Sequence, residues 1–247
     1  MRLTKKKRTG NYLCNRFFLC ETVSMILNIY KEKDWTSFDV VAKLRGVLGI
    51  KKIGHAGTLD PLAEGVLIVL TEKDTKRQSE FMSMEKEYIA EIAFGAQSPS
   101  YDLETPLEFS NNKIELDELE TKLCELLPKY TGEIQQRVPA YSAVKVDGQP
   151  LYKKARKGDV SLQQLPVKTV TINALKVTEV KEMEFEGTLL PVVVLKITCS
   201  KGFYVRSLAN DLGEDLNVGG VLVKLTRTRI GDYTVESAKR VDEIKRL

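Results

Sequence analysis

The stretch Gly54–Leu67 reads GHAGTLDPLAEGVL, and the interpretation of the whole chain starts from it. It holds His55, the one histidine among 247 residues, and an Asp-Pro step at Asp60-Pro61. The apolar run Val66–Leu70 follows and has the length of a strand buried on both faces. Loops that lead into buried strands often carry chemistry, and a carboxylate there could act as nucleophile or general base. By residue type alone, a turn-forming Asp and a packed histidine are the simpler interpretations.

The segments on either side of this stretch predict an α/β fold in which strands and helices alternate over the whole chain. Strands are expected at residues 25–29, 88–94 and 192–199. A helix is expected after the capping box of Thr36 and Asp39, ending at Gly49. Further helices are expected at 116–127, stopped by Pro128, and at 205–216. Asp147-Gly148 is a hairpin-turn signal. One mixed domain with an inserted subdomain is therefore expected.

Composition narrows the class of protein. Hydrophobic content of 43% and charged content of 29% are ordinary for a globular protein. A net charge of +4 suits a polyanionic partner without indicating one. Four scattered cysteines and a single histidine argue against a structural zinc site or a disulfide framework, and favour a cytoplasmic location. No apolar run reaches the length of a membrane span.

Common catalytic motifs are absent from the sequence. There is no G-x-S-x-G elbow and no phosphate-binding P-loop, and a Ser-His-Asp site would have to use His55. Any chemistry must therefore come from carboxylate, arginine and tyrosine side chains.

Five segments, in order, resemble the TruB-type pseudouridine synthases, the tRNA pseudouridine-55 synthase family. The quoted stretch resembles the family signature G-H-x-G-x-L-D-P-x-A-x-G. The other four are WTSFDVVAKLR (35–45), KEYIAEIAFG (86–95), VPAYSAVKVDGQPLYKKARKG (138–158) and CSKGFYVRSLANDLG (199–213). One such motif would be weak, whereas five in order are a specific signal. The implied fold has a central mixed, largely antiparallel sheet flanked by helices, with an inserted RNA-facing subdomain.

The resemblance implies that Asp60 is the catalytic aspartate. It would attack a flipped-out uridine at either the base or the sugar, without metal or cofactor. The N-glycosidic bond breaks, the uracil rotates, and a carbon–carbon bond forms to C5. Extruding the base costs roughly a few kcal/mol.

The remaining implied site residues surround that aspartate. His55 would insert into the RNA near the vacated base, and Tyr88 would stack on the uracil. Arg206 would pair with Asp60 and hold it for attack. Tyr204, Asp102 and Lys31 would complete the polar surroundings. Taken singly, each of these residues also fits an ordinary structural role.

A basic segment implies RNA contact. Its residues are Lys145, Lys153, Lys154, Arg156 and Lys157. They would touch RNA phosphates, although a solvated charged face is an equally good interpretation.

Two loops depart from the family pattern. Lys31-Glu32-Lys33-Asp34 replaces the usual Lys-Pro-x-Gly, and Ser98-Pro99-Ser100 replaces Thr-Asp-Thr before Asp102. These departures predict a more mobile loop at residues 31–34 and weaker binding or a lower rate.

The sequence predicts a short N-terminal stretch followed by one catalytic domain. Residues 1–24 form either a disordered basic arm or a stretch before a true start at Met25. Residues 25–247 form the catalytic domain, with no complete C-terminal PUA-type domain. Weaker and more salt-sensitive tRNA binding than in longer relatives is therefore expected.

The function expected from the resemblance is isomerisation of uridine 55 in the tRNA T-loop by a monomeric enzyme without an obligate protein partner. The alternatives are an RNA-binding tRNA-folding chaperone that lacks turnover, a synthase for another RNA, and a carboxylate-dependent hydrolase. The hydrolase leaves the aromatic and basic segment unexplained.

Overall fold

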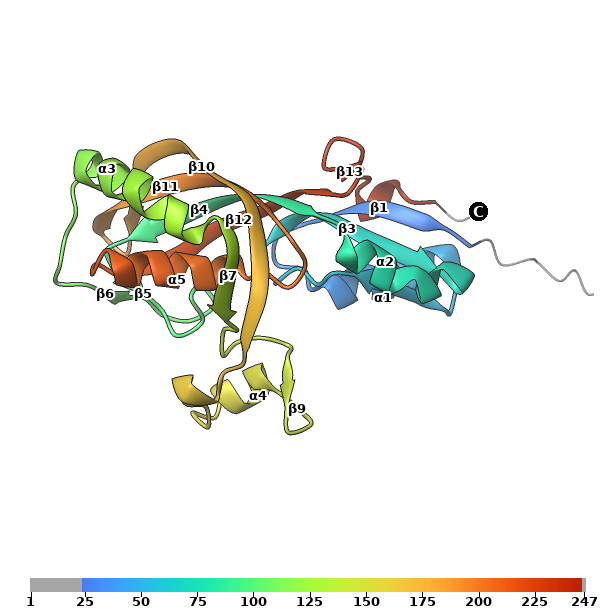
Figure 1. Ribbon diagram of the computed structural model, residues 1–247. Helices are drawn as coiled ribbons and strands as arrows, with labels where there is room; N and C mark the ends of the chain where they lie inside the picture. Colours follow the sequence, from blue (N-terminus) through green and yellow to red (C-terminus); the bar gives the residue numbers. More distant parts are fainter. Residues whose placement is uncertain (1–23, 246–247) are drawn as a thin grey trace, which may run out of the picture.

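The computed structural model describes residues 24–245, which form an elongated molecule around one long twisted sheet (Figure 1). The neighbouring strands along the sheet are β1 (Ile26–Lys31), β3 (Glu64–Thr71), β12 (Gly220–Ile230), β4 (Lys86–Phe94), β11 (Thr188–Cys199), β10 (Val167–Phe185) and β7 (Gly132–Arg137). Along this path only β3 and β12 run parallel. The short strands β2 (Ile53–Ala56) and β13 (Tyr233–Thr234) pair with β3 and β12. The mixed, largely antiparallel sheet is as predicted.

Helix α1 (Ser37–Leu48) confirms the expected capping signals. The Thr36 hydroxyl accepts from the Asp39 amide at 3.0 Å, and the Asp39 carboxylate accepts from the Thr36 amide at 2.8 Å. Gly49 ends the helix in the left-handed region, with φ 66°. The buried face of α1 packs against strands β1, β2 and β3.

Two further helices cover the other half of the sheet. Helix α3 (Leu116–Leu126) passes into the 3-10 turn η2 (Leu127–Tyr130) at Pro128, and α5 (Val205–Asp215) follows β11. Both bury their apolar faces in one core with β4, β10 and β11. Leu59 and Ala63 belong to the same core, so the residues on both sides of Asp60 anchor its loop in the core.

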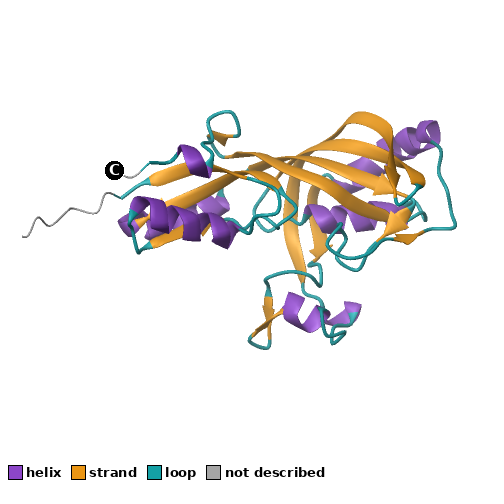
Figure 2. Cartoon of the chain, turned by 180° about the vertical axis from the view of Figure 1, so that it is seen from behind, coloured by secondary structure: helices purple, strands orange, loops and turns teal. Residues whose placement is uncertain are grey.

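The segment 138–166, called here the insertion, projects from the sheet between β7 and β10 (Figures 1 and 2). It contains β8 (Lys145–Val146), β9 (Gln149–Pro150), α4 (Leu151–Ala155) and η3 (Leu162–Gln164). Asp147 and Gly148 form the predicted turn with φ 53° and 79°. The insertion has its own small core of Val138, Leu151 and Leu165.

The remaining elements are short. They are η1 (Glu72–Arg77), α2 (Gln78–Ser83), β5 (Ala96–Gln97), β6 (Glu108–Phe109) and η4 (Val241–Glu243). No helix of the described part is both long and apolar enough to cross a membrane.

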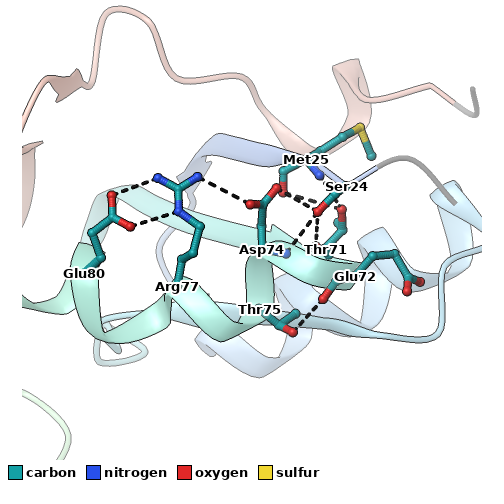
Figure 3. Close-up of polar contacts among 8 residues, drawn as sticks. All are labelled: Ser24, Met25, Thr71, Glu72, Asp74, Thr75, Arg77 and Glu80. Atoms are coloured by element: carbon teal, nitrogen blue, oxygen red, sulfur yellow. Dashed lines mark hydrogen bonds and ion pairs between the residues drawn. The ribbon is translucent and has the colours of Figure 1, made fainter.

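The first described residues are tied to η1 and the end of β3 (Figure 3). The Ser24 hydroxyl donates to the Asp74 carboxylate at 2.8 Å, and the Met25 amide donates to the Thr71 hydroxyl at 2.8 Å. Arg77 then bridges Asp74 and Glu80. Of the basic arm predicted at residues 1–24, all but Ser24 lies outside the described residues.

Candidate active site

Asp60 lies in the loop 57–63, between β2 and β3, and neighbouring segments fix this loop. The Ser37 hydroxyl donates to the Leu59 carbonyl at 3.1 Å and accepts from the Leu59 amide at 2.9 Å. The Ala63 amide closes a turn on the Asp60 carbonyl. The aspartate is thus held by its own turn and by the first turn of α1.

Arg206, in the first turn of α5, lies beside this aspartate. Its Nε lies 2.9 Å from Asp60 Oδ2, an ion pair without a well-aligned hydrogen bond. Its Nη1 and Nη2 donate to the carbonyls of Ser100 and Tyr141 at 3.0 and 2.9 Å. The Arg206 side chain is 4% exposed, whereas that of Asp60 is 40% exposed. The buried and anchored guanidinium of Arg206 therefore holds the Asp60 carboxylate in a position where a ligand can reach it.

Asp102 is the second carboxylate beside this guanidinium, with Oδ2 at 3.5 Å from Arg206 Nε. It is buried, and its Oδ1 accepts from the Glu104 amide at 2.9 Å. Burial raises the pKa of the Asp102 carboxyl, although Arg206 acts in the opposite direction. Of the two carboxylates beside Arg206, only Asp60 is open to a ligand.

The two loops that depart from the family pattern are both well anchored. Asp34 takes φ 68°, the left-handed conformation that glycine adopts easily, and its amide donates to the Pro61 carbonyl at 2.8 Å. The hydroxyls of Ser98 and Ser100 both donate to the Asp102 carbonyl, at 2.6 and 3.1 Å. The changed residues thus still support the loops of Asp60 and Asp102.

Tyr88 lies on β4, directly across from Arg227 on β12. Burial raises the pKa of the Tyr88 phenol, whereas the charge of Arg227 and a hydrogen bond with it lower that pKa. Arg227 is 1% exposed and was not predicted as a site residue. Its spacing could have pointed to it: Arg227 lies two residues after the buried Leu225, so alternation along a strand puts both side chains on the same face of β12.

Tyr204 caps α5 at its N-terminus and also packs against the core of the insertion. Gln136 on β7 holds its backbone from both sides: Nε2 donates to the Tyr204 carbonyl at 3.0 Å, and Oε1 accepts from the Tyr204 amide at 2.8 Å. No motif or spacing in the sequence pointed to Gln136. Burial, followed by the charge of Asp60, raises the pKa of the Tyr204 phenol.

Lys31, at the end of β1, is fully buried beside the Asp60 loop. Its Nζ donates to the carbonyls of Glu32, Trp35 and Pro61, at 3.0, 2.6 and 3.2 Å. Burial lowers the pKa of Lys31 to about 8, against the opposing effect of Asp60. Lys31 therefore supports the Asp60 loop from within the fold and is not exposed to a ligand.

His55 lies on the short strand β2, where it pairs with Val69 of β3. Its Nδ1 is buried without a hydrogen-bond partner. Burial, and then the charge of Arg227, lower the pKa of His55. A neutral imidazole near Arg227 is the result.

The predicted basic residues all lie in the insertion, but they differ in their contacts. Lys145, Lys153 and Lys157 are exposed. Lys154 pairs with Asp147 at 3.1 Å, and Arg156 pairs with Glu104 at 2.7 Å. Since the Glu104 amide binds Asp102, Arg156 connects the insertion to the site.

The hollow at Asp60 is small. Lined by Asp60, Asp102, Arg206 and β12, it has a volume of ≈ 10 Å³, room for one water molecule. A larger hollow of ≈ 390 Å³ lies beside Tyr101 and Asp211, away from Asp60. A planar ligand would therefore meet Asp60 from its exposed side. Among the described residues, no group of three or more His, Cys, Asp or Glu is placed to hold a metal ion.

Comparison with known families gives a direct match. The model for the TruB family pseudouridylate synthase (N terminal domain) matches residues 45–205. A tRNA pseudouridine synthase B of Phocaeicola vulgatus is 43% identical, covering 88% of this chain and 90% of the relative. One of Parabacteroides distasonis is 42% identical, covering 89% and 91%.

Solved structures show the same fold. A Cbf5-Nop10-Gar1 complex contains a chain that is 28% identical, with a TM-score of 0.62. The match covers 88% of this chain and 53% of the other, so this chain spans about half of that protein. An H/ACA RNP bound to a substrate RNA containing 2'-deoxyuridine contains a chain with a TM-score of 0.62 at 24% identity. It covers 88% of this chain and 51% of the other.

Proposed function

The chain belongs to the TruB family of pseudouridylate synthases, and we propose that Asp60 is the carboxylate with which it isomerises uridine 55 in the T-loop of tRNA. The reaction, conversion of uridine in tRNA to pseudouridine, follows from the family and from the names of its relatives. The observation that supports the role of Asp60 is its exposed carboxylate, 2.9 Å from the buried guanidinium of Arg206.

The steps follow from what these groups can do. The target uridine is flipped out of the T-loop, and Asp60 attacks it at the base or the sugar. The N-glycosidic bond breaks, and the freed uracil turns while it remains held. C5 then bonds to the ribose carbon, the bond to Asp60 breaks and frees the carboxylate, and the hydrogen at C5 leaves as a proton to water. Arg206, anchored by two carbonyl oxygens, keeps the carboxylate in place through these steps.

The neighbouring residues take supporting roles. Tyr88 stacks on the uracil, which contributes roughly 1–3 kcal/mol per base. Neutral His55 enters the RNA beside the vacated base. Asp102 and Tyr204 frame Arg206, and Lys31 supports the Asp60 loop.

The exposed lysines of the insertion contact phosphates of the T-arm, the part of the tRNA that this monomeric, cytoplasmic enzyme grips. Salt-dependent binding is the expected consequence. Residues 25–247 act together as the catalytic domain.

The experiment uses tRNA transcripts with tritium at C5 of uridine. Wild-type protein without added metal or cofactor is given a transcript with uridine at position 55 and a matched one with cytidine there, whose labelled uridines lie elsewhere. Release of one tritium per uridine-55 transcript, with none from the cytidine transcript, is expected. Equal release from both would contradict the choice of position.

Tight tRNA binding without any release would favour the chaperone instead. The two altered loops were the reason to consider it, but Asp34 and the two serines still make supporting contacts.

A further inference from the structure

Arg227 is a fully buried arginine that none of the roles above uses. From the centre of the sheet, its Nε donates to the Val66 carbonyl on β3 at 2.8 Å. Its Nη2 donates to the Gly57 carbonyl, at the start of the Asp60 loop, at 2.9 Å. One guanidinium therefore joins the buried strand to the loop that carries the catalytic aspartate.

Among the described residues, no ion pair joins Arg227 to a carboxylate. Burying a cation without a counter-charge is costly unless hydrogen bonds satisfy it. Arg229, two residues further along β12, shows the ordinary arrangement: it is partly exposed and pairs with Glu85 at 2.8 Å. The uncompensated charge of Arg227 is thus a feature of this position and not of the strand.

Tyr88 on β4 is the direct cross-strand neighbour of Arg227, and Val66 lies on β3, the strand on the other side of β12. A Cβ on Gly65 would lie 2.3 Å from the Arg227 carbonyl oxygen, so the backbones of β3 and β12 approach closely at this point. The hydrogen bonds to Val66 and Gly57 tie the guanidinium to β3 and to the Asp60 loop, while the pairing of β12 with β4 places Tyr88 next to Arg227.

We propose that Arg227 is a positioning residue that holds the Gly57 end of the Asp60 loop and the phenol of Tyr88 in one fixed relation. The Asp60 carboxylate and the uracil stacked on Tyr88 then keep the same relative position while the uracil turns. This inference deepens the proposed function and rests on the roles assigned to Asp60 and Tyr88. An arginine suits the task because its rigid fork binds several acceptors at once, whereas lysine is a single point charge.

The test compares Arg227→Met and Arg227→Lys with the control Arg229→Met, from the same strand. Folding is first established for each by circular dichroism and thermal unfolding, and assays run well below the lowest Tm. Single-turnover tritium release gives the rate, and filter binding of the T-arm stem-loop gives Kd. Hydrogen exchange of a peptide spanning residues 54–63 reports the mobility of the loop.

We expect Arg227→Met to lower the single-turnover rate by about 10²-fold, the size of effect that a 1 Å misplacement produces. Its Kd should stay within about threefold, and exchange of the loop peptide should rise. Arg227→Lys should recover part of the rate, and Arg229→Met should leave both rate and loop exchange near wild type.

A folded Arg227→Met variant with wild-type rate and wild-type loop exchange would overturn the proposal. So would equal losses in Arg227→Met and Arg229→Met, because a general weakening of β12 would then explain both. Should Arg227→Met fail to fold, Arg227→Lys carries the same comparison. If wild type releases no tritium, the proposed function fails, and with it the catalytic part of this inference; loop exchange still decides whether Arg227 clamps Gly57.

Discussion

At the scale of single residues, the site depends on an asymmetry in burial. The guanidinium of Arg206 donates hydrogen bonds to the backbone carbonyls of Ser100 and Tyr141, and it forms an ion pair with Asp60. Asp60 is 40% exposed, whereas its partner Arg206 is buried and anchored by two carbonyls. A lysine has three donors on a single nitrogen, but it lacks the planar fork whose separate nitrogens reach Ser100, Tyr141 and Asp60.

Arg206→Lys is therefore expected to lower the single-turnover rate by about 10²-fold or more while Kd for the stem-loop changes little. The measurement is tritium release with enzyme in excess, alongside filter binding. A rate within threefold of wild type would mean that charge alone, without the anchored fork, is sufficient.

Asp211 on α5 predicts a pH effect on stability. Burial raises the pKa of its carboxyl to about 6 in the folded state, above the ordinary value of 3.8. The folded chain thus holds this proton more tightly, and the unfolding free energy falls as pH rises from about 4 to 6. Asp211→Asn should then be more stable than wild type at pH 7.5, by about 1–2 kcal/mol after allowance for partial exposure, with no gain at pH 4. Urea unfolding at both pH values measures this; an equal effect at the two would contradict the assignment.

At the scale of elements, two helical glycines predict opposite outcomes. A Cβ on Gly213 of α5 would lie 2.0 Å from the Gly220 amide nitrogen of β12, whereas one on Gly46 of α1 would meet nothing within 4 Å. Gly213→Ala must therefore push the helix bearing Arg206 off the sheet, at a cost of about 3 kcal/mol or more. Gly46→Ala should stabilise by about 0.5–1 kcal/mol. Thermal unfolding of both variants checks the pair, and destabilisation of equal size would be the contrary result.

The elements that the sequence predicted are those with local signals. Thr36, Asp39 and Gly49 bound α1, and apolar runs mark β3, β4 and β11. Strand β10 was missed because only Val170 and Ile172 of its residues are buried, and two bulges with β11 reset its alternation. Strand β12 was missed because charged residues interrupt its apolar positions.

The site residues likewise separate into those that the sequence could indicate and those that only the tertiary structure reveals. Sequence resemblance pointed to Asp60 and Arg206, and the fold brings them within 2.9 Å. It could not point to Arg227 or Gln136, because their roles consist of hydrogen bonds to distant backbone atoms, which only the tertiary structure brings together.

At the scale of the whole molecule, the insertion is joined to the site by charge. Arg156 is held by Glu104, so a phosphate must compete with this carboxylate. Glu104→Gln should free Arg156, tighten stem-loop binding severalfold at low salt, and steepen the slope of log Kd against log salt by about one. Glu118→Gln is the control, because Glu118 makes a comparable exposed pair with Lys122 on α3. If the two variants have the same salt slope, Arg156 does not meet phosphate.

The most direct test of the role of Asp60 is the single-turnover rate of Asp60→Asn on tRNA tritiated at C5 of uridine 55. The substitution keeps the size of a half-exposed side chain, so folding and Kd should stay close to wild type. We expect binding within about threefold of wild type and no detectable release of tritium. Release at a measurable fraction of the wild-type rate would show that Asp60 is not the attacking group.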